Sequence, residues 1–263
     1  MSDAGRMPFE HERTDMAKIV KFIMERFDTN VAGGNFSFKA IDRDGDIGEV
    51  GQDYIIMTPT MMSEAYLGTL TAAQILVVEP HTRKIIDGVG NLTREINMHE
   101  AVYDANPDIK AILHGHAKEQ LAWATMGVPI PNLTEATQKV KGVEVLPFRH
   151  NCSEEIAEMV GGYIAELGDA ALMHEYLLNS HGTMITVGGK DMSGLTAMHK
   201  AVSVVDTMEF NAHIAYEQTM LQVQGELDGY YSKGVKIGTL DDVFKDHKAI
   251  YNDKTNAELE TQC

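Results

Sequence analysis

The chain has 263 residues, of which 44% are hydrophobic and 23% charged, the composition of an ordinary soluble globular protein with ample apolar residues for a core. Its formal net charge of -17 argues against nucleic acids and anionic membranes as general partners, because both require basic surface. No apolar run approaches the roughly 20 residues that span a bilayer, and the first residues lack the apolar segment of a secretory signal, so we expect a cytoplasmic protein.

The first third of the chain predicts one helix followed by strand hairpins. Residues 8–28 carry apolar side chains at the spacing of one helical face, and the glycine pair at 33–34 breaks this pattern. An alternating segment and a polar, glycine-containing turn at 42–46 follow, which is typical of a hairpin. The strands expected in this part of the chain are 36–39, 53–57, 74–78 and 84–87.

The rest of the chain alternates short strands with helices. The helices expected are 95–103 with Thr93 as its N-cap, 117–126, 154–167 with Ser153 as its N-cap, and a long helix opened by 188–191. The strands expected are 108–113, 143–147, 170–178 and 184–187. Because strands come as hairpins interrupted by helices, the pattern predicts a single α/β domain over residues 1–251, with helices on both faces of a mostly antiparallel sheet. Residues 252–263 are polar and are expected to form a poorly ordered tail.

Three histidines follow apolar segments of the kind that form strands. His114 and His116 close the strand expected at 108–113, and residues two apart in a strand point to one face, so both imidazoles can reach one ion. His181 ends the apolar segment 170–178, and the glycine after it lets the backbone turn sharply. These three residues are therefore candidate metal ligands.

The composition limits which side chains can bind a metal. Two cysteines exclude a disulfide framework and a cysteine zinc cluster, so a metal must depend on His, Asp and Glu. Neutral imidazole is a preferred ligand for zinc, and a catalytic zinc typically keeps three protein ligands and one open position. An isolated His-x-His is more often a surface or core pair, so the hypothesis depends on the segments around it.

Three other segments carry groups that can bind an anion or move a proton. The segment Gly33, Gly34 and Asn35 lies between a helix and a strand, where backbone amides can cradle a phosphate, although its composition alone is more typical of a plain turn. Thr60 belongs to a polar turn that follows a strand. Glu95 lies in the first turn of its helix, where a carboxylate also complements the helix dipole.

In their order along the chain, these segments resemble the class II aldolase and adducin family. The resemblance rests on Gly-Gly-Asn-Phe-Ser at 33–37, Thr-Pro-Thr at 58–60, a Glu nineteen residues before His-x-His, and Asn-Ser-His-Gly at 179–182. It extends from about residue 18 to about residue 217. It implies a three-layer α/β/α domain with a mostly antiparallel central sheet, a divalent metal that is usually Zn²⁺, with Mn²⁺, Co²⁺ or Mg²⁺ as alternatives, and a homotetramer with active sites at subunit interfaces.

The resemblance also implies roles for single residues. His114, His116 and His181 match the metal ligands of the family, and Glu95 matches its acid/base carboxylate. The related epimerases resemble one another in having Asp at that position, so the Glu favours an aldolase. The implied reaction cleaves a phosphorylated ketose, a sugar 1-phosphate, to dihydroxyacetone phosphate and an aldehyde through a metal-stabilised enediolate, while the carboxylate moves a proton at carbon.

The anion-binding segments depart from the fuculose-type aldolase pattern. Ala32 replaces a threonine, Met61 replaces a glycine, and Thr93 and Arg94 replace paired serines. The Arg guanidinium can hold phosphate or carboxylate bidentately. The residues expected to hold the anionic end of the substrate are Gly33, Gly34, Asn35, Thr60, Thr93 and Arg94.

The second acid/base group also departs from the aldolase pattern. The position of an interface tyrosine that protonates the leaving group is Glu135 in an ungapped comparison, and Tyr230 or Tyr231 are alternatives to it. The same residues leave a metal-dependent decarboxylase, dehydratase or sugar-phosphate 4-epimerase open as functions. A non-enzymatic, adducin-like interaction domain is disfavoured, because the three histidines and Glu95 are all retained.

Overall fold

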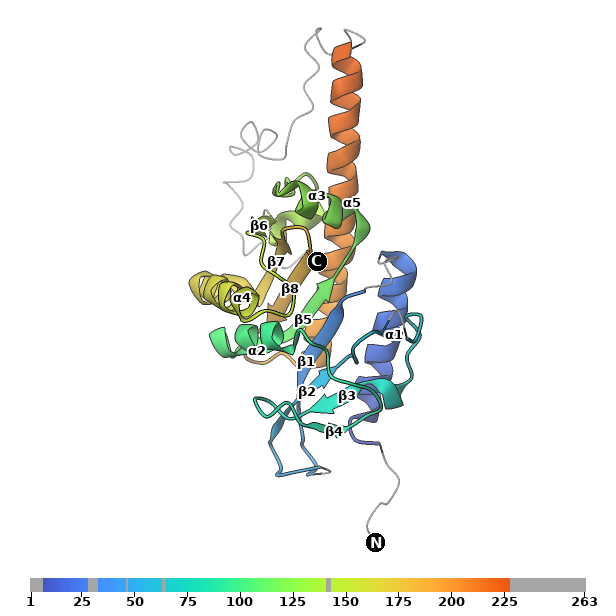
Figure 1. Ribbon diagram of the computed structural model, residues 1–263, viewed down its shortest axis with the longest axis vertical. Helices are drawn as coiled ribbons and strands as arrows, with labels where there is room; N and C mark the ends of the chain where they lie inside the picture. The colour runs from blue at the N-terminus through green and yellow to red at the C-terminus, as the bar shows by residue number, and fades with distance from the viewer. Residues whose placement is uncertain (1–6, 28–32, 46, 63–64, 141–142, 228–263) are drawn as a thin grey trace, which may run out of the picture.

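The computed structural model describes residues 7–27, 33–45, 47–62, 65–140 and 143–227. These residues form an eight-stranded sheet in the order β4-β3-β2-β1-β5-β8-β7-β6 (Figure 1). The strands are β1 (Asn35–Ile41), β2 (Asp53–Met57), β3 (Leu76–Val78), β4 (Ile85–Asp87), β5 (Ile109–Gly115), β6 (Glu144–Leu146), β7 (Met173–Leu178) and β8 (Gly182–Gly188). Neighbouring strands run antiparallel, except that β6 and β7 are parallel, which confirms the expected mostly antiparallel sheet.

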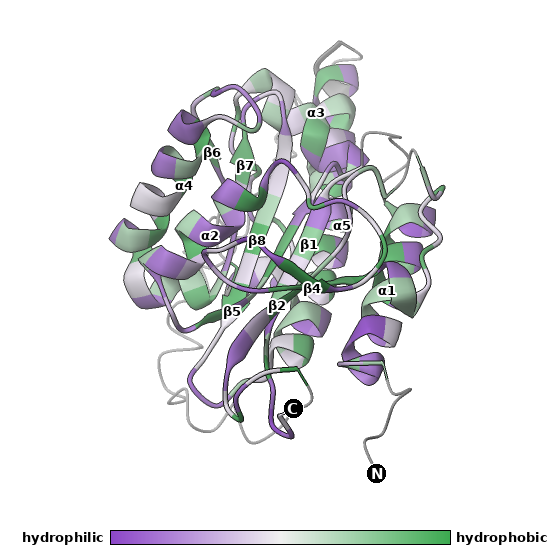
Figure 2. Ribbon diagram, turned by 60° about the horizontal axis from the view of Figure 1, so that its bottom comes forward, coloured by the Kyte–Doolittle hydropathy of each residue, from purple (hydrophilic) through white to green (hydrophobic). Residues whose placement is uncertain are grey.

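Helices cover both faces of this sheet, as expected (Figures 1 and 2). The helices α1 (Glu10–Arg26), α3 (Lys118–Met126) and α5 (Gly194–Leu227) pack on one face, and α2 (Ile96–Ala105) and α4 (Glu154–Leu167) pack on the other. Short 3-10 helices lie at η1 (Ala72–Gln74), η2 (Glu135–Lys139) and η3 (Gly168–Leu172). Among the helices within the described ranges, none is both long enough and apolar enough to cross a membrane.

The central strands are buried on both faces, which explains why they are apolar along their whole length. All seven residues of β8 are buried, and so are all but one of the seven in β5. On β1, Phe36 and Phe38 point into the core beneath α1 and α5, whereas Ser37 contacts the α2 side. Asn35 lies two residues before Ser37 and therefore shares its face.

The expected boundaries of helices and strands hold within a few residues, with two corrections. Ser153 is the N-cap of α4, as expected, because its Oγ accepts the amide of Ile156 at 3.2 Å. The expectation that Thr93 caps the helix at 95–103 is wrong: α2 begins at Ile96 and Glu95 occupies the N-cap position. The Thr93 hydroxyl instead accepts the amide of Glu95 at 3.3 Å, so it orders the turn before the helix.

The second correction concerns one strand and one helix that begin later in the sequence than expected. The strand expected at 170–178 begins only at Met173, because η3 occupies the residues before it. The long helix expected from 188–191 begins at Gly194, after a turn in which the Ser193 hydroxyl accepts the amide of Thr196 at 3.2 Å. Tyr230, Tyr231 and the tail expected at 252–263 lie outside the described residues.

Candidate metal and active site

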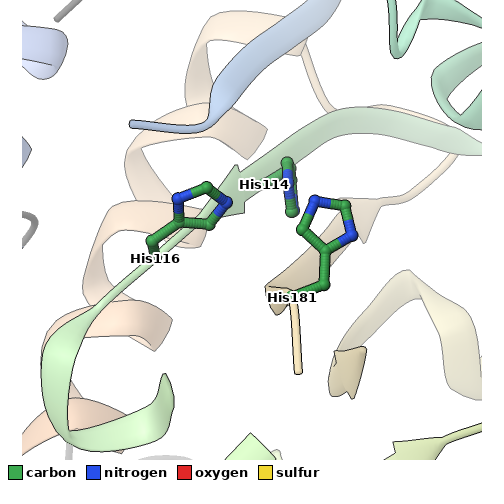
Figure 3. A group of neighbouring side chains, drawn as sticks. All are labelled: His114, His116 and His181. Atoms are coloured by element: carbon green, nitrogen blue, oxygen red, sulfur yellow. The ribbon is translucent and has the colours of Figure 1, made fainter. Parts of the chain in front are cut away.

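Three histidines converge where strands in the interior of the sheet end (Figure 3). His114 lies near the end of β5, His116 follows that strand directly, and His181 lies in the turn between β7 and β8. One potential ligand atom from each ring lies within 4.8 Å of the other two. The ring centroids are 4.8 to 5.7 Å apart. One metal ion can therefore contact all three side chains, as the spacing in the sequence predicted.

The protonation of these rings suits a metal. The Nδ1–H of His114 donates to the carbonyl oxygen of Thr183 at 2.9 Å, which leaves the lone pair of Nε2 directed into the cluster. Burial lowers the pKa of His114 to about 3 despite the nearby carboxylate of Glu95. Burial also lowers the pKa of His116 to about 4. Both rings are therefore neutral at physiological pH, which is the form that binds metals.

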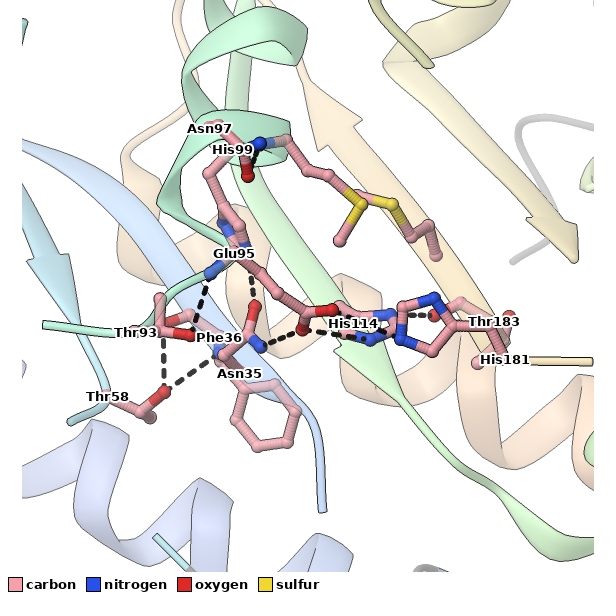
Figure 4. A network of polar contacts seen from close by, with 12 residues as sticks. Asn35, Phe36, Thr58, Thr93, Glu95, Asn97, His99, His114, His181 and Thr183 are labelled. Carbon is pink, nitrogen blue, oxygen red and sulfur yellow. Dashed lines mark hydrogen bonds and ion pairs between the residues drawn. The ribbon is translucent and has the colours of Figure 1, made fainter. Parts of the chain in front are cut away.

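Glu95 contacts two of the three histidines. Its Oε2 lies 3.4 Å from Nε2 of His114, and its Oε1 lies 3.1 Å from Nε2 of His181. The side-chain amide of Asn35 donates to Oε2 at 2.7 Å (Figure 4). Burial by itself raises the pKa of Glu95, but His114, His181 and the Asn35 amide outweigh it and hold the pKa well below its usual range. Glu95 is therefore an ionised, partly desolvated carboxylate, which is able to accept a proton.

The glycine before Asn35 permits the close approach of β1 to β5. Asn35 pairs with His114 across the two strands, and a Cβ atom on Gly34 would overlap the carbonyl oxygen of His114. Any side chain at this position would push the two strands apart. Gly34, one of the glycines expected to cradle an anion, thus has a packing role beside the histidines.

The turn that carries His181 differs in detail from expectation. The left-handed backbone conformation belongs to Ser180, with φ 57°, and not to Gly182. Gly182 is required for space, because a Cβ there would overlap the carbonyl oxygen of Gly115 and approach the ring of His116. The glycine therefore lets the β7–β8 turn lie against the end of β5.

The remaining anion-binding candidates lie on two loops in contact. The amide of Thr60 donates to the carbonyl oxygen of Asn91 at 2.9 Å, so the loop after β2 touches the loop that leads into α2. Thr93 is buried there and Arg94 is exposed. Met61, which stands in place of a glycine in the pattern of the fuculose-type aldolases, has a φ of 57° and so keeps a left-handed conformation.

The candidates for a second acid/base group stay predictions. Glu135 is an exposed residue at the start of η2, a segment that packs on α5. Tyr230 and Tyr231 lie beyond the described part of α5. The structure adds buried polar residues to which the sequence analysis assigned no role in the site: His99, Ser37 and Tyr103 beside Asn35, and Thr183 beside His114. The one signal for His99 was its position one helical turn after Glu95.

A second buried carboxylate lies behind His114. The Oε1 atom of Glu175 accepts the hydroxyl of Thr183 at 2.8 Å. Burial raises the pKa of Glu175 well above its usual range, and the negative charge of Glu209 adds to this effect. Glu209 itself accepts the backbone amide of Gln120 at 3.1 Å at the start of α3. In the folded protein Glu175 therefore keeps its proton to higher pH than an ordinary glutamate does.

We expect Glu175→Gln to change the pH dependence of stability. The unfolded chain loses the Glu175 proton near its ordinary pKa of 4.5, whereas the folded chain keeps it to higher pH, so wild-type stability falls as the pH rises through this window. Gln cannot ionise, so the variant gains stability relative to wild type as the pH rises above the ordinary carboxyl pKa of 4.5. Urea unfolding of the metal-free protein measures this difference.

The exposed Glu158 on α4 offers a matched control. Glu158→Gln removes the same charge without touching the buried network, and its stability should follow wild type across the pH range. Parallel curves for Glu175→Gln and wild type would mean that Glu175 is ionised in the folded protein.

Comparison with known proteins supports the resemblance in the sequence. A family model described as the Class II Aldolase and Adducin N-terminal domain matches residues 14–216. L-fuculose phosphate aldolase of Methanococcus maripaludis is 29% identical over 181 residues, which are 68% of this chain and 86% of that protein. A protein named 3-oxo-tetronate 4-phosphate decarboxylase, from Haemophilus influenzae, is 27% identical over 184 residues, which are 67% of this chain and 76% of that protein.

The fold is shared with solved structures as well. The crystal structure of YgbL from Klebsiella pneumoniae matches with a TM-score of 0.60 and 25% identity, over 79% of this chain and 89% of that chain. The family model covers well over half of the sequence, including the histidines, Glu95 and Asn35. The chain belongs to the class II aldolase and adducin family.

Proposed function

We propose that this protein is a metal-dependent aldolase that cleaves a phosphorylated ketose, a sugar 1-phosphate, to dihydroxyacetone phosphate and an aldehyde. The observation that carries the proposal is an ionised Glu95 in contact with two members of a three-histidine cluster. The relative named L-fuculose phosphate aldolase supports this reaction. A phosphorylated substrate also agrees with a cytoplasmic location, since phosphate esters do not readily cross membranes.

We propose Zn²⁺ as the metal, with Mn²⁺, Co²⁺ or Mg²⁺ as alternatives. His114, His116 and His181 would hold it, and three imidazole ligands fit zinc better than magnesium, which prefers oxygen ligands. When bound, a divalent ion supplies a Lewis acid for the negative charge that develops on the carbonyl oxygen of the substrate. The Thr183 carbonyl orients the His114 ring for this task.

The protein side chains then have to move two protons. Cleavage breaks the bond between C3 and C4, the O4 hydroxyl loses its proton to a base, and the electron pair of the broken bond passes to the carbonyl end of the ketose. We propose that Glu95 removes the C3 proton in the reverse, condensation direction. In the cleavage direction the ionised Glu95 first takes up a proton, in net balance the one released from O4, and gives it to C3. Glu135, Tyr230 or Tyr231 are the candidates for the exchange at O4, and the tyrosines would act across a subunit interface.

We further propose a homotetramer with active sites at subunit interfaces. The support is apolar surface on α5, part of which extends beyond the sheet in Figure 1. Its exposed side chains are Phe210, Tyr216, Met220, Leu221 and Val223. Apolar residues gathered on one projecting element are typical of a protein contact. Sedimentation velocity of the wild-type protein measures the number of chains, and a monomer would contradict this part of the proposal.

The anionic end of the substrate is assigned to the loops at the start of α2. We propose that Arg94, Thr93, Thr60 and the segment 33–35 bind it, because an acidic protein needs a local cationic anchor. Arg94 directly precedes Glu95, so one turn of backbone positions the anion and the reacting carbon together.

We expect Arg94→Ala to raise KM for a phosphorylated substrate by about tenfold or more, the usual worth of a charge-assisted hydrogen bond. The dephosphorylated analogue should lose much less. Initial rates against substrate concentration measure both values. Arg43→Ala serves as the control, because Arg43 is exposed at the opposite end of β1. Equal losses for both substrates would assign Arg94 to the support of the fold.

A second candidate function is decarboxylation of a phosphorylated 3-oxo acid. It is favoured by the relative named 3-oxo-tetronate 4-phosphate decarboxylase and by Arg94, whose guanidinium can hold a carboxylate. Loss of CO₂ beside a ketone develops the same negative charge as aldol cleavage, so the histidines and Glu95 suit both reactions.

One experiment separates the two functions. The protein is loaded with Zn²⁺, Mn²⁺ or Co²⁺ in turn and incubated with phosphorylated ketoses and phosphorylated 3-oxo acids. Aldehyde, CO₂ and epimerised sugar are scored separately. Release of aldehyde with dihydroxyacetone phosphate supports the aldolase, and release of CO₂ alone replaces it with the decarboxylase. Failure of every metal and substrate class to give product would contradict both.

A further inference from the structure

A chain of hydrogen-bonded side chains extends from Glu95 into the protein, away from the histidines. The amide of Asn35 donates to Glu95 at 2.7 Å, and the carbonyl oxygen of the same Asn35 side chain lies 2.6 Å from Nε2 of His99. The other ring nitrogen of His99 lies 2.7 Å from the hydroxyl of Ser37, which lies 2.8 Å from the hydroxyl of Tyr103. Figure 4 shows the Glu95, Asn35 and His99 part of this chain.

Two elements supply this chain at matching intervals. Asn35 and Ser37 lie two residues apart on β1 and so share the face toward α2. Glu95, His99 and Tyr103 lie four residues apart at and along α2 and so share one face of the helix. The two rows interdigitate, so that residues from β1 and α2 alternate along the chain.

The direction of every hydrogen bond follows from the carboxylate at its end. Glu95 accepts, so the NH₂ group of Asn35 must face it, because the reverse orientation would set two acceptors against each other. The Asn35 oxygen then faces His99, whose Nε2 must carry the hydrogen. Burial lowers the pKa of His99 to about 3, so the ring is neutral and its Nδ1 is an acceptor.

The far end of the chain follows the same rule. Since Nδ1 of His99 accepts, the Ser37 hydroxyl must donate to it, and the Ser37 oxygen then accepts from Tyr103. Burial raises the pKa of Tyr103, so its hydroxyl keeps its proton. All four bonds therefore point toward Glu95.

The four hydrogen bonds donate in the same direction in a site without bulk water, and this strengthens the bond from Asn35 to Glu95. Asn35, Ser37, His99 and Tyr103 are all buried, and hydrogen bonds in series polarise one another at low dielectric. The Asn35 amide thus donates to Glu95 more strongly than a solvated amide would. It also fixes which carboxylate oxygen is held and which, Oε1, stays beside His181.

We infer that His99 is a positioning residue for the reaction: through Asn35 it fixes the orientation of the Glu95 carboxylate toward the reacting carbon. This inference rests on the proposed function, in which Glu95 moves the proton. His99 itself contacts Asn35 and Ser37, and its contribution passes to Glu95 through the Asn35 amide.

The kinetic test compares three variants of the metal-loaded enzyme. His99→Leu removes both ring nitrogens at similar volume, and we expect kcat to fall about 10- to 100-fold, as for partners that orient a catalytic ligand, with KM within about twofold. His99→Gln offers one donor and one acceptor, so it should recover most of this loss. His174→Leu is the matched control, because His174 is a buried histidine of β7 that hydrogen-bonds Tyr163 at 2.9 Å.

Kinetic results decide the inference as follows. The inference is supported if kcat falls in His99→Leu, recovers in His99→Gln and stays at the wild-type value in His174→Leu. Equal kcat losses in His99→Leu and His174→Leu, or a loss that appears in KM instead, would overturn it. If His99→Leu does not fold, Tyr103→Phe and His99→Gln carry the comparison. The hydrogen-bonded side chains then predict a small kcat loss for Tyr103→Phe with unchanged metal content. An unchanged kcat in Tyr103→Phe would overturn the inference.

A spectroscopic test needs no substrate and so separates this inference from the proposed function. Two-bond ¹H–¹⁵N spectra of histidine-labelled wild-type protein should show His99 as the neutral tautomer with hydrogen on Nε2. The side-chain amide resonances of Asn35 should shift in His99→Leu and stay in place in His174→Leu. The opposite tautomer, or unshifted Asn35 resonances, overturns the inference whatever the substrate. If the spectra agree and no substrate turns over, the proposed function fails and the hydrogen-bonded chain stands.

Discussion

Glu95→Gln is expected to lower kcat by about 100-fold or more, because the amide keeps the shape of the side chain but cannot exchange a proton with carbon. The Gln carbonyl can still accept the Asn35 amide, and the three histidines are untouched, so metal content and melting temperature should stay close to wild type. Steady-state kinetics, elemental analysis and thermal unfolding on the same preparation measure all three quantities.

The control for this variant is a Glu→Gln change of the same kind elsewhere. Glu158→Gln on the exposed face of α4 should leave kcat unchanged. Near-normal turnover by Glu95→Gln would place the carbon acid/base group elsewhere, and Glu135 would be the next residue to substitute. A loss of metal together with turnover would instead assign Glu95 to metal binding.

His116→Ala is expected to reduce the bound metal from about one ion per chain to well below that value after dialysis. Loss of a residue that only orients a ligand costs about 10- to 100-fold in affinity, so loss of a ligand should cost more than about 100-fold. His116 is the best ligand to remove, because it follows β5 and is half-buried, whereas His114 lies inside the strand and is fully buried. Elemental analysis of the dialysed protein measures this loss.

The exposed His199 on α5 provides the comparison. His199→Ala removes an imidazole that lies outside the cluster and should leave the metal content at the wild-type value. Circular dichroism shows whether His116→Ala keeps its fold. A folded His116→Ala protein with undiminished metal would remove His116 from the site.

The sequence by itself determined the elements that carry the site. Apolar runs and helical spacing predicted α1, β2, β5 and α4 within a few residues, because local burial patterns and caps depend on neighbours along the chain. The same local rule placed His114 and His116 on one face of a strand. Ordered motifs then supplied the family, which the match over residues 14–216 confirms.

Thr93 shows where local reasoning reached its limit. A threonine two residues before a helix-forming segment is a good N-cap by propensity, yet the helix begins after Glu95. The Glu95 side chain contacts Asn35, His114 and His181, which lie on other strands and turns. Such contacts leave no trace in the residues next to Thr93.

Only the tertiary structure decided how the site residues meet. The order of β1, β5 and β8 in the sheet sets Asn35 opposite His114 and Thr183 beside the His114 ring, and strand order depends on pairing between segments far apart in sequence. The hydrogen-bonded side chains through His99 and the raised pKa of Glu175 also belong to this level. The physical reason is that hydrogen-bond direction and pKa depend on burial and on facing partners, which exist only once the sheet and its helices have packed.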